Sequence, residues 1–226
     1  MNSNLEELRK IQEPTQNFQS LKPFRWGLDG GGKDLIKEVI ISKKINLMLE
    51  IGVFFGDSVK QWLETSQDLV VIGIDPYPNF VKYFKNKAEI HHSKGFLDYQ
   101  SLDYDSLLKQ LDQPDGTLLN ILSNLRDHTD RFIPLRGTSP EKLYEIHKLG
   151  IVPDLIYIDS DKEMRELEVC HDLFPNSIIS GDDWTWKGKG KQKEQKTFPI
   201  RKPVYDFAER HGYQVISRKA TWLLEK

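Results

Sequence analysis

Three absences limit what this chain can be. A single cysteine, Cys170, cannot form an internal disulfide. Apolar runs stay well short of the roughly 18 to 20 residues that a membrane-spanning helix needs, and the N-terminus carries no charged segment followed by an apolar core. The 32 basic and 34 acidic residues give a formal charge of -2, without the basic field of a dedicated nucleic-acid-binding protein. We therefore expect a cytoplasmic protein that has neither nucleic acid nor a membrane as its partner.

The size and composition favour one domain. With 226 residues, 38% of them hydrophobic, the chain can bury a sizeable core. We expect a single domain over 1–226, in which 1–44 form an N-terminal helical extension. The polar, Asp-rich stretch 91–130 has two helical apolar patterns, which predict a helical insertion.

Short apolar runs alternate with segments of helical periodicity, and this order is typical of βαβ units. The predicted strands cover 45–52, 69–75, 132–137, 154–159, 177–181, 213–217 and 221–224, and the predicted helices between them cover 33–41, 58–64, 140–149, 163–174 and 204–211. The last two strands follow each other closely enough to pair antiparallel. The pattern predicts an α/β fold with a mostly parallel sheet and an antiparallel C-terminal edge.

Two of the predicted strands end on carboxylates. The run 155–158 stops at Asp159, and the run 177–181 stops at Asp182 and Asp183. Buried parallel strands deliver such residues to one edge of a sheet, where ligands bind in open α/β folds. These acids are therefore candidates for a metal or catalytic site.

The glycines of the chain do not form a standard phosphate-binding loop. The turn after the first predicted strand has Gly52 and Gly56 with bulky residues between them, so it does not read GxGxxG. Gly27 and the Gly32–Lys33 pair match the first part of a P-loop, but Asp34 stands where a Ser or Thr should hold magnesium. Neither motif predicts a nucleoside triphosphate or a dinucleotide.

The segment Glu50 to Ser58 resembles the first motif of the class I S-adenosylmethionine-dependent methyltransferases. Asp75, at the end of the second strand, resembles the acid that binds the ribose hydroxyls in that family; alternatively it is a turn former before Pro76. Ser139 lies where the family places its adenine-contacting loop. The resemblance implies a Rossmann-like, seven-stranded sheet with helices on both faces. The cofactor-binding residues that it implies are Glu50, Gly52, Gly56, Ser58, Asp75 and Ser139.

The two acidic strand ends resemble the metal motifs of the catechol and caffeoyl-CoA O-methyltransferase branch and of related bacterial enzymes that methylate sugars and other natural products. The resemblance implies that Asp159, Asp182 and Asp183 hold Mg²⁺ or a similar hard cation, which prefers oxygen ligands. Asp183 departs from the family, which has Asn there. Either it binds the metal, or it caps or turns the following loop.

We therefore expect a methyltransferase that acts on a hydroxyl of a small molecule, with Lys162 as the base and Asp159 as a further catalytic residue. The lysine is otherwise a solvated residue at a helix start. The lysine-rich run 187–196 is either a loop that closes over an anionic acceptor or a solvated loop. Metal-independent O- or N-methylation and a non-catalytic binding module are the alternatives. A homo-oligomer is an additional expectation.

Overall fold

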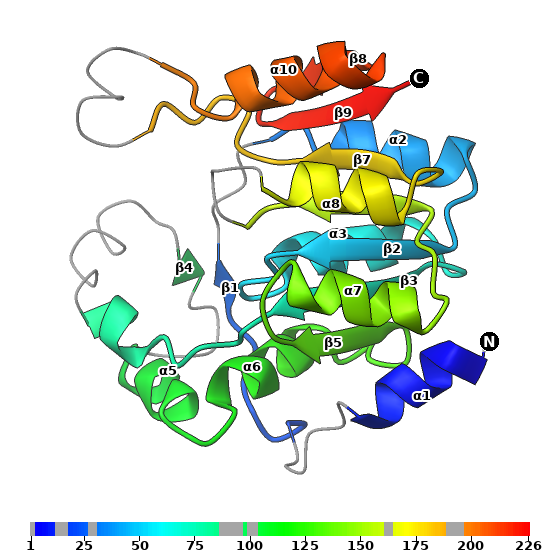
Figure 1. Ribbon diagram of the computed structural model, residues 1–226. Coiled ribbons are helices and arrows are strands. Elements are labelled where there is room, and N and C mark those ends of the chain that lie inside the picture. Colours follow the sequence, from blue (N-terminus) through cyan, green and yellow to red (C-terminus); the bar gives the residue numbers. More distant parts are fainter. Residues whose placement is uncertain are drawn as a thin grey trace.

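The computed structural model describes residues 3–11, 18–26, 31–85, 97–98, 104–160, 165–188 and 197–226. Its centre is a seven-stranded sheet with the strand order β5-β3-β2-β6-β7-β9-β8 (Figure 1). The strands of this sheet are β2 (Leu47–Ile51), β3 (Val70–Asp75), β5 (Phe132–Arg136), β6 (Leu155–Ile158), β7 (Ile178–Gly181), β8 (Gln214–Arg218) and β9 (Thr221–Glu225). All seven strands predicted from the sequence are present.

The direction of the strands also agrees with the prediction. β5, β3, β2, β6 and β7 run parallel to one another. β9 pairs antiparallel with β7, and β8 pairs antiparallel with β9. The fold is therefore a mostly parallel Rossmann-like sheet with an antiparallel C-terminal edge.

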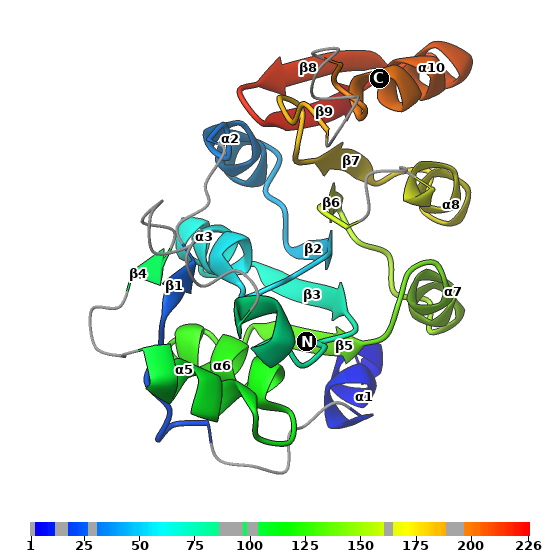
Figure 2. The ribbon, with the colours of Figure 1, turned by 90° about the vertical axis from the view of Figure 1, so that its left-hand side faces the viewer.

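Helices cover both faces of the sheet. They are α1 (Ser3–Ile11), α2 (Asp34–Ser42), α3 (Asp57–Thr65), α5 (Tyr104–Leu111), α6 (Gly116–Asn124), α7 (Glu141–Lys148), α8 (Glu166–Leu173) and α10 (Arg201–His211). Helices α2, α3 and α6 lie on one side of the sheet, and α7 and α8 lie on the other (Figure 2). In the part of the chain that the structure describes, no helix is both long and apolar enough to cross a bilayer.

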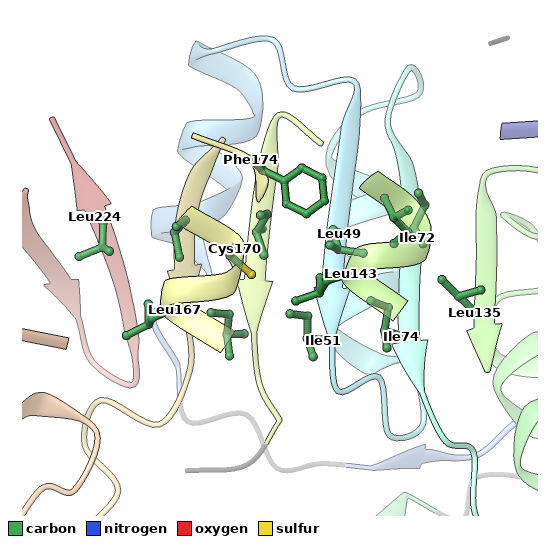
Figure 3. Packing of buried hydrophobic residues seen from close by; sticks show 14 of the residues in the cluster. Leu49, Ile51, Ile72, Ile74, Leu135, Leu143, Leu167, Cys170, Phe174 and Leu224 are labelled. Atoms are coloured by element: carbon green, nitrogen blue, oxygen red, sulfur yellow. The ribbon is translucent and has the colours of Figure 1, made fainter. Parts of the chain in front are cut away.

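Alternation along the strands separates two apolar clusters. Leu49 and Ile51 of β2 face one cluster, whereas Met48 faces the other. The first cluster packs α7 and α8 on the sheet through residues such as Leu143 and Leu167 (Figure 3). Because side chains alternate between the faces of a strand, continuous apolar runs are needed where both faces are covered.

Two segments have a structure that the sequence patterns did not specify. Arg25 and Trp26 form the short strand β1, which pairs antiparallel with β4 (Leu97–Asp98). Helix α6 lies between β3 and β5 in the chain and is almost entirely buried, so this part of 91–130 supplies a core crossover helix between two parallel strands. The expected domain boundaries stay a prediction.

The turn after β2 is fixed by a close backbone contact. Gly52 has a φ of 92°, and a Cβ at this position would lie 2.3 Å from the carbonyl oxygen of Asp159. Gly56 has a φ of 79° and is the N-cap of α3. Both glycines are therefore required by the backbone conformation, and Gly52 also by its contact with the end of β6.

Glu50 anchors α3 to the sheet. Its side chain is fully buried, the Ser58 hydroxyl donates to Oε1, and the Trp62 indole N–H donates to Oε2 at 2.8 Å. Burial raises the pKa of the Glu50 carboxyl from 4.5 to about 8, partly offset by the bond from Ser58. The carboxyl is therefore mostly protonated near neutral pH, which removes the cost of a buried charge.

Replacement of Gly52 by alanine should destabilise the fold. We expect Gly52→Ala to lower the free energy of unfolding by about 2 kcal/mol or more, because a strained φ is combined with a backbone clash. Urea denaturation measures this. Gly212→Ala is the matched control, since Gly212 has a φ of 72° but no described residue beyond its chain neighbours within 4 Å of the place that a Cβ would take; it should cost about 1 kcal/mol. Equal losses of unfolding free energy in the two variants would show that the contact between Gly52 and the Asp159 carbonyl does not matter for stability.

Glu50 should make stability depend on pH. The folded state binds a proton more tightly than the unfolded state, so the free energy of unfolding should fall as pH rises from 4.5 to about 8 and then level off. Glu50→Gln should remove this fall, which we expect to be on the order of 5 kcal/mol. Urea denaturation across this pH range is the measurement, with Glu64→Gln on the exposed side of α3 as control. An unchanged pH dependence in Glu50→Gln would show that the proton is bound elsewhere.

Candidate functional site

A large cavity opens at the carboxyl ends of the parallel strands. Its volume is about 1140 Å³, which exceeds the roughly 300 to 1000 Å³ of a typical small-molecule pocket. Residues that follow β2, β3, β5, β6 and β7 all contribute to its wall. This is the position at which open α/β sheets bind their ligands.

Asp75 lines the cavity and also holds the turn after β2. Its Oδ2 accepts the backbone N–H groups of Val53 and Phe54 at 3.0 and 3.1 Å. Its Oδ1 accepts the N–H of Tyr77 at 2.7 Å. Each carboxylate oxygen can accept two hydrogen bonds, so capacity remains for one ligand hydroxyl. Asp75 is thus a turn residue that can still accept a hydrogen bond from one ribose hydroxyl, but not from two.

The loop after β5 forms the next part of the wall. Gly137, Thr138 and Ser139 line the cavity. The Ser139 hydroxyl is buried and has no hydrogen-bond partner within the described parts of the chain. Buried polar atoms are rarely left unpaired, so this hydroxyl is suited to bind a ligand. Flat apolar surface comes from Phe54, Phe80, Tyr83 and Trp186.

The predicted metal ligands lie along the same cavity. Asp159, Asp182 and Asp183 all line it, as do Gly52, Asp75 and Ser139 of the predicted cofactor set. The strand pairing explains this, because β6 and β7 are adjacent and their register aligns Ile158 with Gly181. Two acidic strand ends, separated in sequence, therefore meet at one edge.

These acids do not fit a divalent cation. Asp182 Oδ2 is 3.0 Å from the Lys33 ammonium, and Asp182 Oδ1 accepts the backbone N–H of Asp183 at 2.8 Å. Asp183 has a φ of 62°, which is a turn conformation. Among the residues that the structure describes, no three His, Cys, Asp or Glu side chains are arranged to hold a metal ion. The predicted Mg²⁺ is therefore unsupported, and the alternative role of Asp183 as a turn residue agrees with its backbone.

Other predicted residues lie outside the cavity wall or outside the described chain. Glu50 and Ser58 bond to each other beneath the turn, and Gly56 packs near Ile121. None of the three is among the described residues that line the cavity, so their part is to shape the turn. Lys162 and residues 189–196 lie outside the described residues, and their predicted roles stay predictions.

The structure adds two residues that sequence reasoning missed. In the sequence Lys33 matches only part of a P-loop and the start of a predicted helix, and its partner Asp182 is 149 positions away. Glu166, at the start of α8, lines the cavity with 5% of its surface exposed; Ser160 donates to its Oε1 at 3.0 Å. A helix-start glutamate has no distinctive sequence signal. Trp184, unlike Trp186, is buried and packs on Tyr205 rather than on the cavity.

Comparison with known proteins places the fold. No protein-family model and no curated protein matches the chain. The O-methyltransferase TomG from Streptomyces achromogenes, solved with S-adenosylmethionine, is 11% identical; the match covers 99% of this chain and 89% of that one, with a TM-score of 0.54. The Podospora anserina methyltransferase PaMTH1, solved with S-adenosylhomocysteine, is 16% identical; the match covers 100% and 88%, with a TM-score of 0.51. The chain has the Rossmann-like fold of these methyltransferases.

Proposed function

We propose that this protein is an S-adenosylmethionine-dependent methyltransferase that transfers the methyl group to a hydroxyl of a small molecule. The observation that carries the proposal is a shared cavity. Gly52, Asp75 and Ser139, which are predicted to bind the methyl donor S-adenosylmethionine, line the same cavity as the acidic strand ends. The solved structures of similar fold that contain S-adenosylmethionine or its demethylated product support it. The cavity volume leaves room for an acceptor beside the donor.

The reaction is an in-line displacement. The acceptor oxygen forms a bond to the methyl carbon while the carbon–sulfur bond breaks, and sulfur keeps the electron pair. The hydroxyl proton must go to a base, because a neutral hydroxyl is a poor nucleophile. Asp159 is the candidate base among the described residues of the cavity, and Lys162 is the candidate from the family resemblance. No step of this proposal passes through a metal.

The acceptor is proposed only by class. The aromatic side chains of Phe80, Tyr83 and Trp186 provide surface for an apolar or aromatic part of the molecule. An anionic acceptor, a homo-oligomer and a cytoplasmic location stay predictions from the sequence.

Binding of S-adenosylhomocysteine tests the donor site. Calorimetric titration should show binding to the wild-type protein, and Asp75→Asn should weaken it at least about tenfold, because a charged hydrogen-bond acceptor is lost. Asp127→Asn, on an exposed turn, is the matched control and should bind as wild type does. Absence of binding to the wild-type protein at high micromolar concentration would overturn the proposed function and favour a non-catalytic module.

Ser139→Ala tests the same site without disturbing the turn. Since the hydroxyl has no partner within the described residues, its removal should leave the unfolding temperature unchanged and weaken S-adenosylhomocysteine binding about three- to tenfold. Calorimetry and thermal unfolding of the same sample are the measurements. Unchanged affinity would remove Ser139 from the donor site.

A further inference from the structure

A buried lysine lies at the edge where the family resemblance implies a metal. The Lys33 ammonium is 3.0 Å from Asp182 Oδ2, and the two side chains are only 7% and 12% exposed. A buried charge is costly unless it is paired, so each member of this pair requires the other. The ammonium therefore provides positive charge beside an acidic cavity wall.

A glycine loop brings Lys33 to this edge. Gly32 has a φ of 93°, and a Cβ there would lie 1.8 Å from the carbonyl oxygen of Arg218, the last residue of β8. The backbone N–H of Ala220 donates to the carbonyl of Gly31 at 3.2 Å. The loop is thus packed directly on the C-terminal hairpin, and these glycines serve this contact rather than a phosphate.

Asp182 is held from the opposite side. The Trp222 indole N–H donates to its backbone carbonyl at 3.0 Å, and the Asp183 N–H donates to its Oδ1. Both carboxylate oxygens are therefore engaged by protein hydrogens. A Mg²⁺ ion would have to lie about 2.0 to 2.1 Å from a carboxylate oxygen of Asp182. At that distance the dication would be next to the Lys33 ammonium, and the two positive charges would repel each other strongly.

We propose that Lys33 occupies the place of the divalent cation and supplies the positive charge at this edge, so that the chain works without a metal. This inference rests on the proposed function for its catalytic meaning. Exclusion of a divalent cation by Lys33 does not depend on that function. The carboxylates of Asp159 and Asp182 remain next to the cavity, with Lys33 as the compensating charge on Asp182.

Titration with Mn²⁺, followed by calorimetry and by the electron paramagnetic resonance of free Mn²⁺, tests the proposal. The wild-type protein should show no binding up to about 1 mM, the weak end of carboxylate sites. Lys33→Met should gain Mn²⁺ binding, because the carboxylates lose their resident charge. Lys37→Met, one turn along α2, is the matched control and should behave as wild type does.

Two outcomes would overturn the proposal. One is wild-type binding of Mn²⁺ at micromolar concentration; the other is a folded Lys33→Met that gains no binding. If Lys33→Met does not fold, Lys33→Gln takes its place, since it removes the charge and still offers a hydrogen-bond donor on a shorter side chain. Titration of the metal-free wild-type protein with S-adenosylhomocysteine separates this result from the proposed function, because the donor site does not include Lys33.

Discussion

The turn after β2 packs so closely on the end of β6 that no side chain can stand at Gly52, and three strand ends depend on this contact. The Asp159 carbonyl lies beneath the turn, and the Asp75 carboxylate holds the turn from the β3 side through the N–H groups of Val53 and Phe54. The same backbone therefore fixes the spacing of β2, β3 and β6 and the floor of the cavity. The packing of this turn therefore determines both the fold and the site, because in a parallel sheet the strand ends that need tight connections also line the crevice where ligands bind.

Charge distribution at this edge follows from burial. Glu50 lies behind the turn, where low polarity keeps it mostly protonated, whereas Asp182 at the cavity has an ammonium as its partner. Two carboxyl groups in the same region thus avoid unpaired charge in different ways. A proton neutralises one and a lysine from a distant loop neutralises the other. The described part of the cavity wall is acidic overall, yet its Asp182 carboxylate is compensated from within the chain.

Much of the architecture was predictable because its signals are local. Short apolar runs predicted all seven strands, and helical periodicity predicted α2, α3, α7, α8 and α10. The pairing of β1 with β4 was missed, since two-residue strands have no periodicity. Helix α6 connects β3 to β5, which are neighbours in the sheet. This role could not be predicted from the helix sequence, because it depends on which strands pair. The Lys33–Asp182 pair is the extreme case: it joins positions 149 apart, and only the assembled sheet edge shows that a Gly–Lys sequence resembling a phosphate loop has another role.

The C-terminal hairpin contacts Asp182 and the two glycines that precede Lys33. Arg218 lies over Gly32, Ala220 bonds to Gly31, and Trp222 bonds to the Asp182 carbonyl. During synthesis the ribosome releases the chain from its N-terminus onward, so Lys33, Asp75 and Asp182 emerge while the hairpin residues are still unmade or enclosed. The bond from Trp222 to the Asp182 carbonyl, which helps to hold Asp182 in place, can form only after residue 222 has left the exit tunnel. Until then the hairpin contacts of Gly31, Gly32 and Asp182 cannot form, so this part of the cavity wall is completed only after the hairpin has been made.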